Sequence, residues 1–155
     1  MKTDTVIQIA SPRARGVPEL ISALNGYLSA LYPPSSNHFL DLDQLSRPDI
    51  RFFVARREGA PLACGALRIA GDYGEVKRMY VAPAARGQGL GRAILEHLES
   101  EARREGLSLM RLETGNRQAE ALALYRGAGY VDCGPFGDYR EDPLSLFLEK
   151  RLTSA

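Results

Sequence analysis

The chain lacks the features that mark membrane, secreted and multidomain proteins. It has no run of about 18 apolar residues, the length that a membrane-spanning helix requires. Residues 1–10 contain one lysine and no apolar stretch of the kind found in signal peptides, so the expected location is the cytoplasm. No internal repeat and no low-complexity linker divides the 155 residues, a length typical of one domain.

Cysteine and net charge are also low. The two cysteines, Cys64 and Cys133, belong to no CxxC motif and no paired Cys/His spacing, so we expect no metal site. The 20 basic residues are scattered, and 19 acidic residues leave a formal net charge of +1. Because so small a charge gives no field for general nucleic-acid binding, we expect neither a nucleic acid nor a membrane as partner.

The composition that remains is that of an ordinary globular domain. Hydrophobic residues make up 45% and charged residues 25%, which allows a core without disulfides or metals. Alternation, helical spacing and turn residues predict where the elements lie. The predicted strands are residues 6–9, 50–56, 62–70, 75–81, 107–113, 130–133 and 145–151, and the predicted helices are residues 18–32, 41–45, 89–105 and 118–128.

The order of these elements predicts the fold class. Short turns at residues 58–61 and 71–74 join three successive strands, which indicates an antiparallel meander. A strand–helix–strand crossover follows, and its two strands should be parallel neighbours. We therefore expect an α+β fold with a mixed, mostly antiparallel central sheet and helices on both faces. In the strand 75–81, alternation predicts that Glu75, Lys77, Met79 and Val81 share one face.

A glycine-rich segment lies between that strand and the next helix. Its sequence at residues 86–92 is RGQGLGR. Such a loop exposes backbone N–H groups at a helix N-terminus, where an anion is favoured, and glycines let a phosphate approach closely. It is no Walker A loop, because no Lys-Ser/Thr pair follows, and no dinucleotide fingerprint, because Arg92 stands where the third glycine is required. The residues alone leave open a pyrophosphate cradle or a plain glycine-rich turn.

The same segment resembles a known family. Arg86-x-x-Gly89-x-Gly91 is similar to the R/Q-x-x-G-x-G/A signature of the GNAT superfamily of N-acetyltransferases. The resemblance continues in VKRMYVAP at residues 76–83, in RLET at residues 111–114, and in ALALYRGAGY at residues 121–130. It implies one GNAT-type domain over residues 3–153 that transfers the acetyl group of acetyl-coenzyme A (acetyl-CoA) to a primary amine. The amine would attack directly in a ternary complex, without a metal.

The resemblance also implies how coenzyme A is held. Backbone N–H groups of the loop would bind its pyrophosphate, the end of the strand before the loop would pair with its pantetheine arm, and Asn116 would contact it from the far side. Tyr125 would lie near the sulfur. The cofactor-binding residues implied in this way are Met79, Tyr80, Val81, Arg86, Gly87, Gln88, Gly89, Leu90, Gly91, Arg92, Asn116 and Tyr125.

Acetyl transfer requires two proton transfers, and these point to candidate catalytic residues. Most alkylamines are protonated at pH 7 and must lose a proton before they attack, while the departing thiolate benefits from a donor. Tyr125 is the expected acid, by resemblance to the Leu-Tyr pair of the family's later helix. Glu75 is the expected base, because it matches a position where the family often has Glu. Glu113, at the end of the neighbouring strand, is the alternative base, and solvent is another.

The acceptor amine is not identified by the sequence. By resemblance, residues 27–45 and 134–139 form the wall of its pocket, and they include aromatic residues such as Tyr139 and a histidine, His38. The substrate-binding residues that we expect are Tyr32, Glu75 and Glu113. His97 lies beside the apolar stripe of its helix and is interpreted as structural.

Other functions remain open at this point. The acceptor is a small-molecule amine or the amine of a protein or peptide, and a homodimer is left open. An acyl-CoA-binding or sensing module without catalysis is an alternative, as is transfer of another acyl group.

Overall fold

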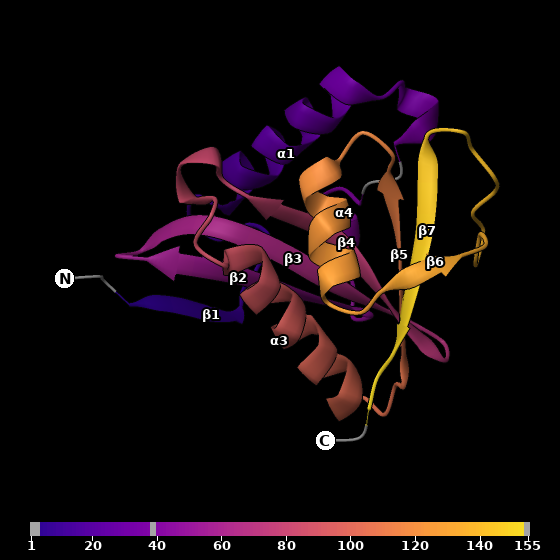
Figure 1. Cartoon of the computed structure of the whole chain (residues 1–155). Helices are drawn as coiled ribbons and strands as arrows, with labels where there is room; N and C mark the ends of the chain where they lie inside the picture. Colours follow the sequence, from indigo (N-terminus) through magenta and orange to yellow (C-terminus); the bar gives the residue numbers. More distant parts are fainter. Residues whose placement is uncertain (1–3, 38–39, 154–155) are drawn as a thin grey trace.

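The computed structural model describes residues 4–37 and 40–153. Within them the chain forms one seven-stranded sheet with strand order β1-β2-β3-β4-β5-β7-β6, with helices on both faces (Figure 1). The α+β prediction is therefore confirmed. The elements in chain order are β1 (Thr5–Ile9), α1 (Val17–Leu31), η1 (Pro34–Ser36), α2 (Leu42–Leu45), β2 (Ile50–Arg57), β3 (Ala60–Ala70), β4 (Tyr73–Val81), η2 (Pro83–Ala85), α3 (Leu90–Arg104), β5 (Leu109–Gly115), α4 (Ala119–Gly127), β6 (Val131–Cys133) and β7 (Ser145–Arg151).

The pairing of β4 with β5 differs from that of the other strands. Among the described residues it is the parallel contact in an otherwise antiparallel sheet, as the predicted crossover through α3 requires. The two strands are in register only at Gly74 with Met110 and at Glu75 with Arg111. Beyond these pairs they diverge toward their C-terminal ends, so the sheet opens where β4 leads into the glycine-rich loop.

Two hydrophobic cores fix the helices on the sheet. The helix α3 presents Leu90, Ile94, Leu98 and Ala102 to the larger core, and the last three are completely buried. This is the stripe that the helical spacing predicts. On the opposite face α1 and α2 cover the second core, with Val17 and other apolar residues against β2 and β3.

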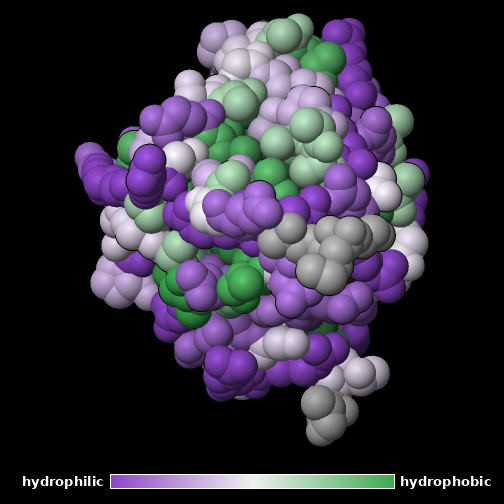
Figure 2. Space-filling view, turned by 90° about the vertical axis from the view of Figure 1, so that its left-hand side faces the viewer, coloured by the Kyte–Doolittle hydropathy of each residue, from purple (hydrophilic) through white to green (hydrophobic). Residues whose placement is uncertain are grey.

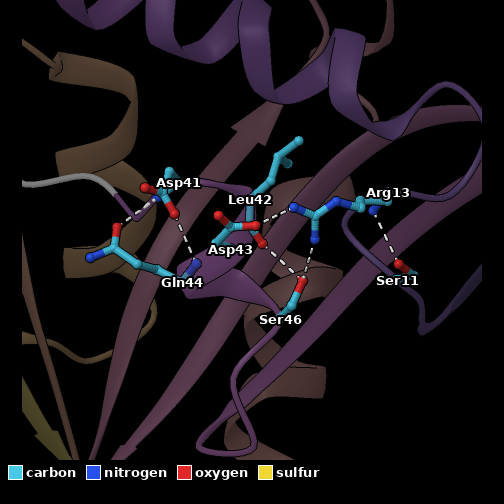
Figure 3. A network of polar contacts seen from close by, with 7 residues as sticks. All are labelled: Ser11, Arg13, Asp41, Leu42, Asp43, Gln44 and Ser46. Carbon is cyan, nitrogen blue, oxygen red and sulfur yellow. Dashed lines mark hydrogen bonds and ion pairs between the residues drawn. The ribbon is translucent and has the colours of Figure 1, made fainter.

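The short helix α2 is fixed by polar contacts (Figure 3). Asp41 is its N-cap and accepts a hydrogen bond from the Gln44 backbone N–H at 2.8 Å, while the Gln44 side chain accepts from the Asp41 N–H at 2.9 Å. This capping box satisfies backbone donors that the first turn leaves free. Arg13 pairs with Asp43 and donates to Ser46 at 3.1 Å, which ties the segment after β1 to α2.

A β-bulge changes the direction of the β4 side chains. Lys77 and Tyr80 lie opposite Ala66 and Cys64 of β3, so that two β4 residues oppose one β3 residue. The extra residue is Arg78, with φ of 56°, and such a bulge reverses the alternation that follows it. The prediction of one shared face for four β4 residues is therefore wrong.

The consequence is a division of β4 between the two faces of the sheet. Glu75 and Lys77 point toward the α1 side, where both contact Tyr139. Met79 and Val81 point the other way and pack against the core under α3. None of the helices formed by residues 4–37 and 40–153 has the length and apolar character needed to cross a bilayer.

Candidate active site

A cleft of about 440 Å³ lies beside the C-terminal end of β4. Its walls come from the end of β4, the loop after it, the start of α3, and α4. Figure 2 views the side on which this loop lies and shows hydrophobic residues gathered in the middle of that face between polar projections. The cleft-lining residues include Met79, Tyr80, Val81, Arg86, Gly87, Gly89, Leu90, Gly91, Arg92, Gln118, Leu124 and Tyr125.

The loop has the geometry of an anion cradle. Gly87 and Gly89 have φ of +77° and +78°, values that residues with a Cβ rarely adopt. A Cβ added at either would meet no atom within 4 Å, so these two glycines border open space. Gly89 is the N-cap of α3 and has no side chain with which to cap it. The N–H groups of the first turn are thus left to bind a ligand.

Gly91 has a different role from Gly89. A Cβ there would lie 3.2 Å from Leu124 Cδ2 of α4 and 3.6 Å from Val81 Cγ2. The absence of a side chain at Gly91 therefore allows α3 to approach α4 closely. Gly91 also borders the cleft. A substitution at Gly91 would change the packing of the cleft wall as well as its lining.

Arg86 and Arg92 lie at the rim of the cleft. Arg86 Nε donates to the Val81 carbonyl at 3.2 Å, and its guanidinium lies 6.0 Å from the centroid of the Tyr80 ring. Arg86 thereby holds the loop against the end of β4. Arg92 is half-exposed and pairs with Glu96 at 3.4 Å.

A second cavity adjoins the cleft on its inner side. This inner cavity measures about 80 Å³ and shares Leu24, Met79, Gln118 and Tyr125 with the cleft. Glu113 lines it too, and Ser145 Oγ donates to Glu113 Oε2 at 2.8 Å. The structure thus brings a carboxylate and a phenol to one small cavity. Its further lining residues include Tyr32, Ser36, Asn37, Lys77, Arg78 and Thr114.

The environment of Tyr125 keeps its hydroxyl protonated. The residue is only 5% exposed, and its ring makes an edge contact with Tyr130 at 5.9 Å between centroids. Burial, and after it the negative charge of Glu113, raise the pKa of Tyr125 well above its usual value. A phenol in this state is a proton donor at every physiological pH.

Tyr32 forms part of the opposite wall of the inner cavity. Its hydroxyl accepts a hydrogen bond from the Arg117 backbone N–H at 2.8 Å, and its ring lies against Gly115, where a Cβ would collide with it. Burial raises the pKa of Tyr32. Tyr32 thereby joins α1 to the turn between β5 and α4 and lines the inner cavity.

Glu75 lies elsewhere than predicted. It is 1% exposed, and three side chains hold its carboxylate: Arg68 Nη1 at 3.3 Å, Lys77 Nζ at 3.4 Å and Tyr139 Oη at 2.6 Å. It borders an outer pocket of about 410 Å³, which Arg68, Tyr73, Tyr139 and residues 137–142 also line. Glu113 and Tyr125, by contrast, border the inner cavity.

Three other predicted residues have contacts of their own. Asn116 donates its side-chain amide to the Pro143 carbonyl at 3.3 Å, while Gln118 of the same turn borders the cleft. His97 contacts the Ala93 carbonyl at 2.9 Å and the Phe53 ring at 5.9 Å between centroids, in agreement with a structural role. His38 lies outside the described residues.

Sequence reasoning missed Lys77 and Gln118 as site residues, and it placed Tyr139 only in the acceptor wall. Lys77 belongs to the strand segment that resembles the family, but straight alternation hid its neighbours. Gln118 follows the segment RLET by four positions. No local pattern marks the contact of Tyr139 with Glu75, because the two are 64 positions apart.

Comparison with known proteins gives a consistent result. A family model described as "Acetyltransferase (GNAT) family" matches residues 17–130. A protein of Azospirillum brasilense named IAA acetyltransferase is 57% identical over 144 residues, which are 92% of this chain and 94% of that protein. A crystal structure from Klebsiella pneumoniae with the description acyl-CoA N-acyltransferase has a TM-score of 0.85 and 36% identity, over 96% of this chain and 98% of that one.

A more distant structure shares the fold alone. It is the PaiA N-acetyltransferase of Thermoplasma acidophilum in complex with coenzyme A, with a TM-score of 0.75 and 15% identity. The two chains superimpose over 96% of this one and 99% of that one.

Proposed function

The chain belongs to the GNAT family of acetyltransferases and is an N-acetyltransferase, and we propose that its inner cavity joins amine and thioester in a ternary complex. In this proposal Glu113 is the base and Tyr125 the acid. The observation that carries it is the shared lining: both side chains border one cavity, which adjoins the cleft through Met79 and Tyr125.

The cleft suits acetyl-CoA as the cosubstrate. The backbone N–H groups of residues 88–92 would bind the pyrophosphate, because they surround a helix N-terminus and the glycines leave space there. Backbone groups of β4 at Met79 and Val81 are left without a β5 partner by the divergence of the strands and would pair with the pantetheine amides. The acetyl end would then reach Tyr125.

Each proton that moves in the proposed reaction has a donor and an acceptor. Glu113 accepts a proton from the amine nitrogen as that nitrogen bonds to the carbonyl carbon of the thioester. Tyr125 donates its hydroxyl proton to sulfur as the carbon–sulfur bond breaks, and the proton on Glu113 then restores the phenol. The amide and the free thiol of coenzyme A are the products. General acid–base catalysis of this kind typically contributes about 10²- to 10⁴-fold.

Glu113 is preferred to Glu75 as the direct base. The Glu75 carboxylate is already bound by a guanidinium, an ammonium and a phenol. It also borders the outer pocket rather than the inner cavity. Glu113 accepts a hydrogen bond from the neutral hydroxyl of Ser145. It also lies close enough to Tyr125 to raise the pKa of that tyrosine.

The acceptor class follows from the inner cavity. About 80 Å³ admits a primary amine on a slender stem, and a carboxylate in the cavity attracts the ammonium form. Both a small molecule and the amine of a protein or peptide have such a group. We propose acetyl rather than a larger acyl group, because the inner cavity beside Met79 and Tyr125 measures only about 80 Å³.

A panel of amines tests this function directly. Purified protein is incubated with acetyl-CoA and each amine, and release of the free thiol is followed together with the mass of the product. We expect release that depends on a primary amine and that falls about 10²-fold or more in the Glu113→Gln variant. Tight binding of coenzyme A without release by any amine would instead indicate a sensing module.

A further inference from the structure

Three side chains form a hydrogen-bonded chain between the two acceptor-side cavities. Lys77 Nζ donates to Tyr139 Oη at 2.6 Å, and Tyr139 Oη donates to Glu75 Oε2 at 2.6 Å. Lys77 borders the inner cavity, whereas Glu75 and Tyr139 border the outer pocket. The chain therefore crosses the wall that separates the two.

The stoichiometry of the reaction calls for such a connection. An acceptor that arrives as an ammonium ion loses two protons when it becomes an amide. The thiol takes up one of them, by the route through Glu113 and Tyr125, and the other must leave for solvent. The inner cavity is small, and coenzyme A would occupy the cleft that adjoins it, so a path through the outer pocket would take the second proton to solvent.

We propose that Lys77, Tyr139 and Glu75 carry this second proton from the inner cavity to the outer pocket. Tyr139 passes its hydroxyl proton to the Glu75 carboxylate and takes one from the Lys77 ammonium. The neutral Lys77 amine then takes the proton of the acceptor ammonium, and protonated Glu75 releases its proton to water in the outer pocket. This inference rests on the proposed function, because it serves an ammonium acceptor in the inner cavity.

The packing of Tyr139 fixes the middle of the chain. Its ring makes edge contacts with Phe136 and Phe147, with centroid distances of 5.1 Å and 5.6 Å. Burial and the neighbouring Glu75 raise the pKa of Tyr139 above its usual value, so its hydroxyl has a proton to donate. Because the ring contacts do not involve the hydroxyl, a phenylalanine at this position keeps the packing, removes both 2.6 Å hydrogen bonds and leaves the longer 3.4 Å contact between Lys77 and Glu75.

Further charged groups surround Glu75. Arg68 of β3 contacts Glu75 at 3.3 Å and also lies 3.7 Å from Asp49, so its charge is shared between two carboxylates. The other charged and titratable groups that face the chain are Tyr73, Arg111, Glu113, Asp138, Arg140, Glu141 and Asp142.

The test compares Tyr139→Phe with a matched control. Tyr73→Phe removes a hydroxyl from the same outer pocket and leaves the three-residue chain intact. Thiol release is measured between pH 6.5 and pH 9.5 with the best acceptor of the panel and with a fluorinated analogue whose ammonium ion has a pKa below 7. We expect Tyr139→Phe to lower kcat on the order of 10²-fold at neutral pH with the first acceptor.

The pH profile and the second acceptor distinguish proton transfer from a structural contact. The deficit should shrink as the pH rises and should nearly vanish with the analogue, which arrives unprotonated, while Tyr73→Phe keeps the parental profile. A parental profile in Tyr139→Phe overturns the path, and so does a loss that is equal for both acceptors at every pH. If the parent itself releases no thiol with any amine, the proposed function fails first and the path fails with it.

Discussion

The chemistry of Tyr125 depends on its surroundings. A phenol in water has a pKa near 10, and burial raises that of Tyr125 further. We expect Tyr125→Phe to lower kcat by about 10²- to 10⁴-fold with little change in coenzyme A affinity, because the ring and its contact with Tyr130 remain.

Stability measurements separate this role from packing. Tyr125→Phe should melt close to the parent, whereas Tyr125→Ala should lose about 3–5 kcal/mol, the usual cost of removing a buried aromatic ring. A Phe variant with parental kcat would show that Tyr125 only fills space.

Gly89 provides a second prediction at the residue scale. Gly89→Ala places a Cβ in the open space of the cradle at φ of +78°, and Gly59→Ala does the same at φ of +80° in the turn between β2 and β3. Both variants carry about the same backbone strain, roughly 1 kcal/mol. Calorimetry should find weaker coenzyme A binding in Gly89→Ala alone. Equal binding by the two variants would mean that the cradle lies elsewhere.

Among the elements, the four-residue helix α2 holds the segment that leads to β2 through its capping box. Asp41→Ala removes the capping box and should lower the free energy of unfolding by about 1 kcal/mol. Asp43→Ala is its control, since Asp43 is 88% exposed and pairs with the half-exposed Arg13, and such surface pairs contribute about 0–1 kcal/mol. Urea titrations measure both, and a larger loss in Asp43→Ala would contradict this ranking.

The elements also show what could be read from the sequence. The helix α3 was predictable because its apolar spacing and its glycines are local, and the loop before it carries the family signature. The bulge in β4 was not, because it depends on packing between distant residues: a Cβ at Gly65 would lie 2.5 Å from Met79 Sδ and 2.6 Å from Ile94 Cγ2. The surroundings of Glu75 were not predictable for the same reason, since the bulge puts Met79 on the other face of the sheet and the contact with Tyr139 spans 64 positions.

At the scale of the whole molecule, several buried tyrosines make the fold sensitive to alkali. Burial raises the pKa of Tyr125 and Tyr130 above 10.0, so the folded state keeps protons that the unfolded state loses. The contribution of these tyrosines to the free energy of unfolding is complete below about pH 10 and falls as the pH rises above it. Urea midpoints of the parent should therefore drop above pH 10, and those of Tyr125→Phe should drop less. An equal drop in both would contradict this linkage.

The proposed mechanism has both substrates bound together, in the cleft and the inner cavity. An acetyl-cysteine intermediate does not fit the cysteines, because Cys64 is fully buried, donates to the Arg78 carbonyl at 3.3 Å, and has a pKa that burial raises to about 12. A thiol in this state is a poor nucleophile. The variant with Cys64→Ala and Cys133→Ala should retain turnover.

Initial-rate kinetics test the central claim most directly. Thiol release is measured while acetyl-CoA is varied at several fixed concentrations of the amine that the panel identifies. The proposed attack of the amine on the thioester in a ternary complex predicts that the double-reciprocal lines intersect. Parallel lines, together with an acetylated protein detected by mass spectrometry when acetyl-CoA is added alone, would contradict direct transfer between the cleft and the inner cavity.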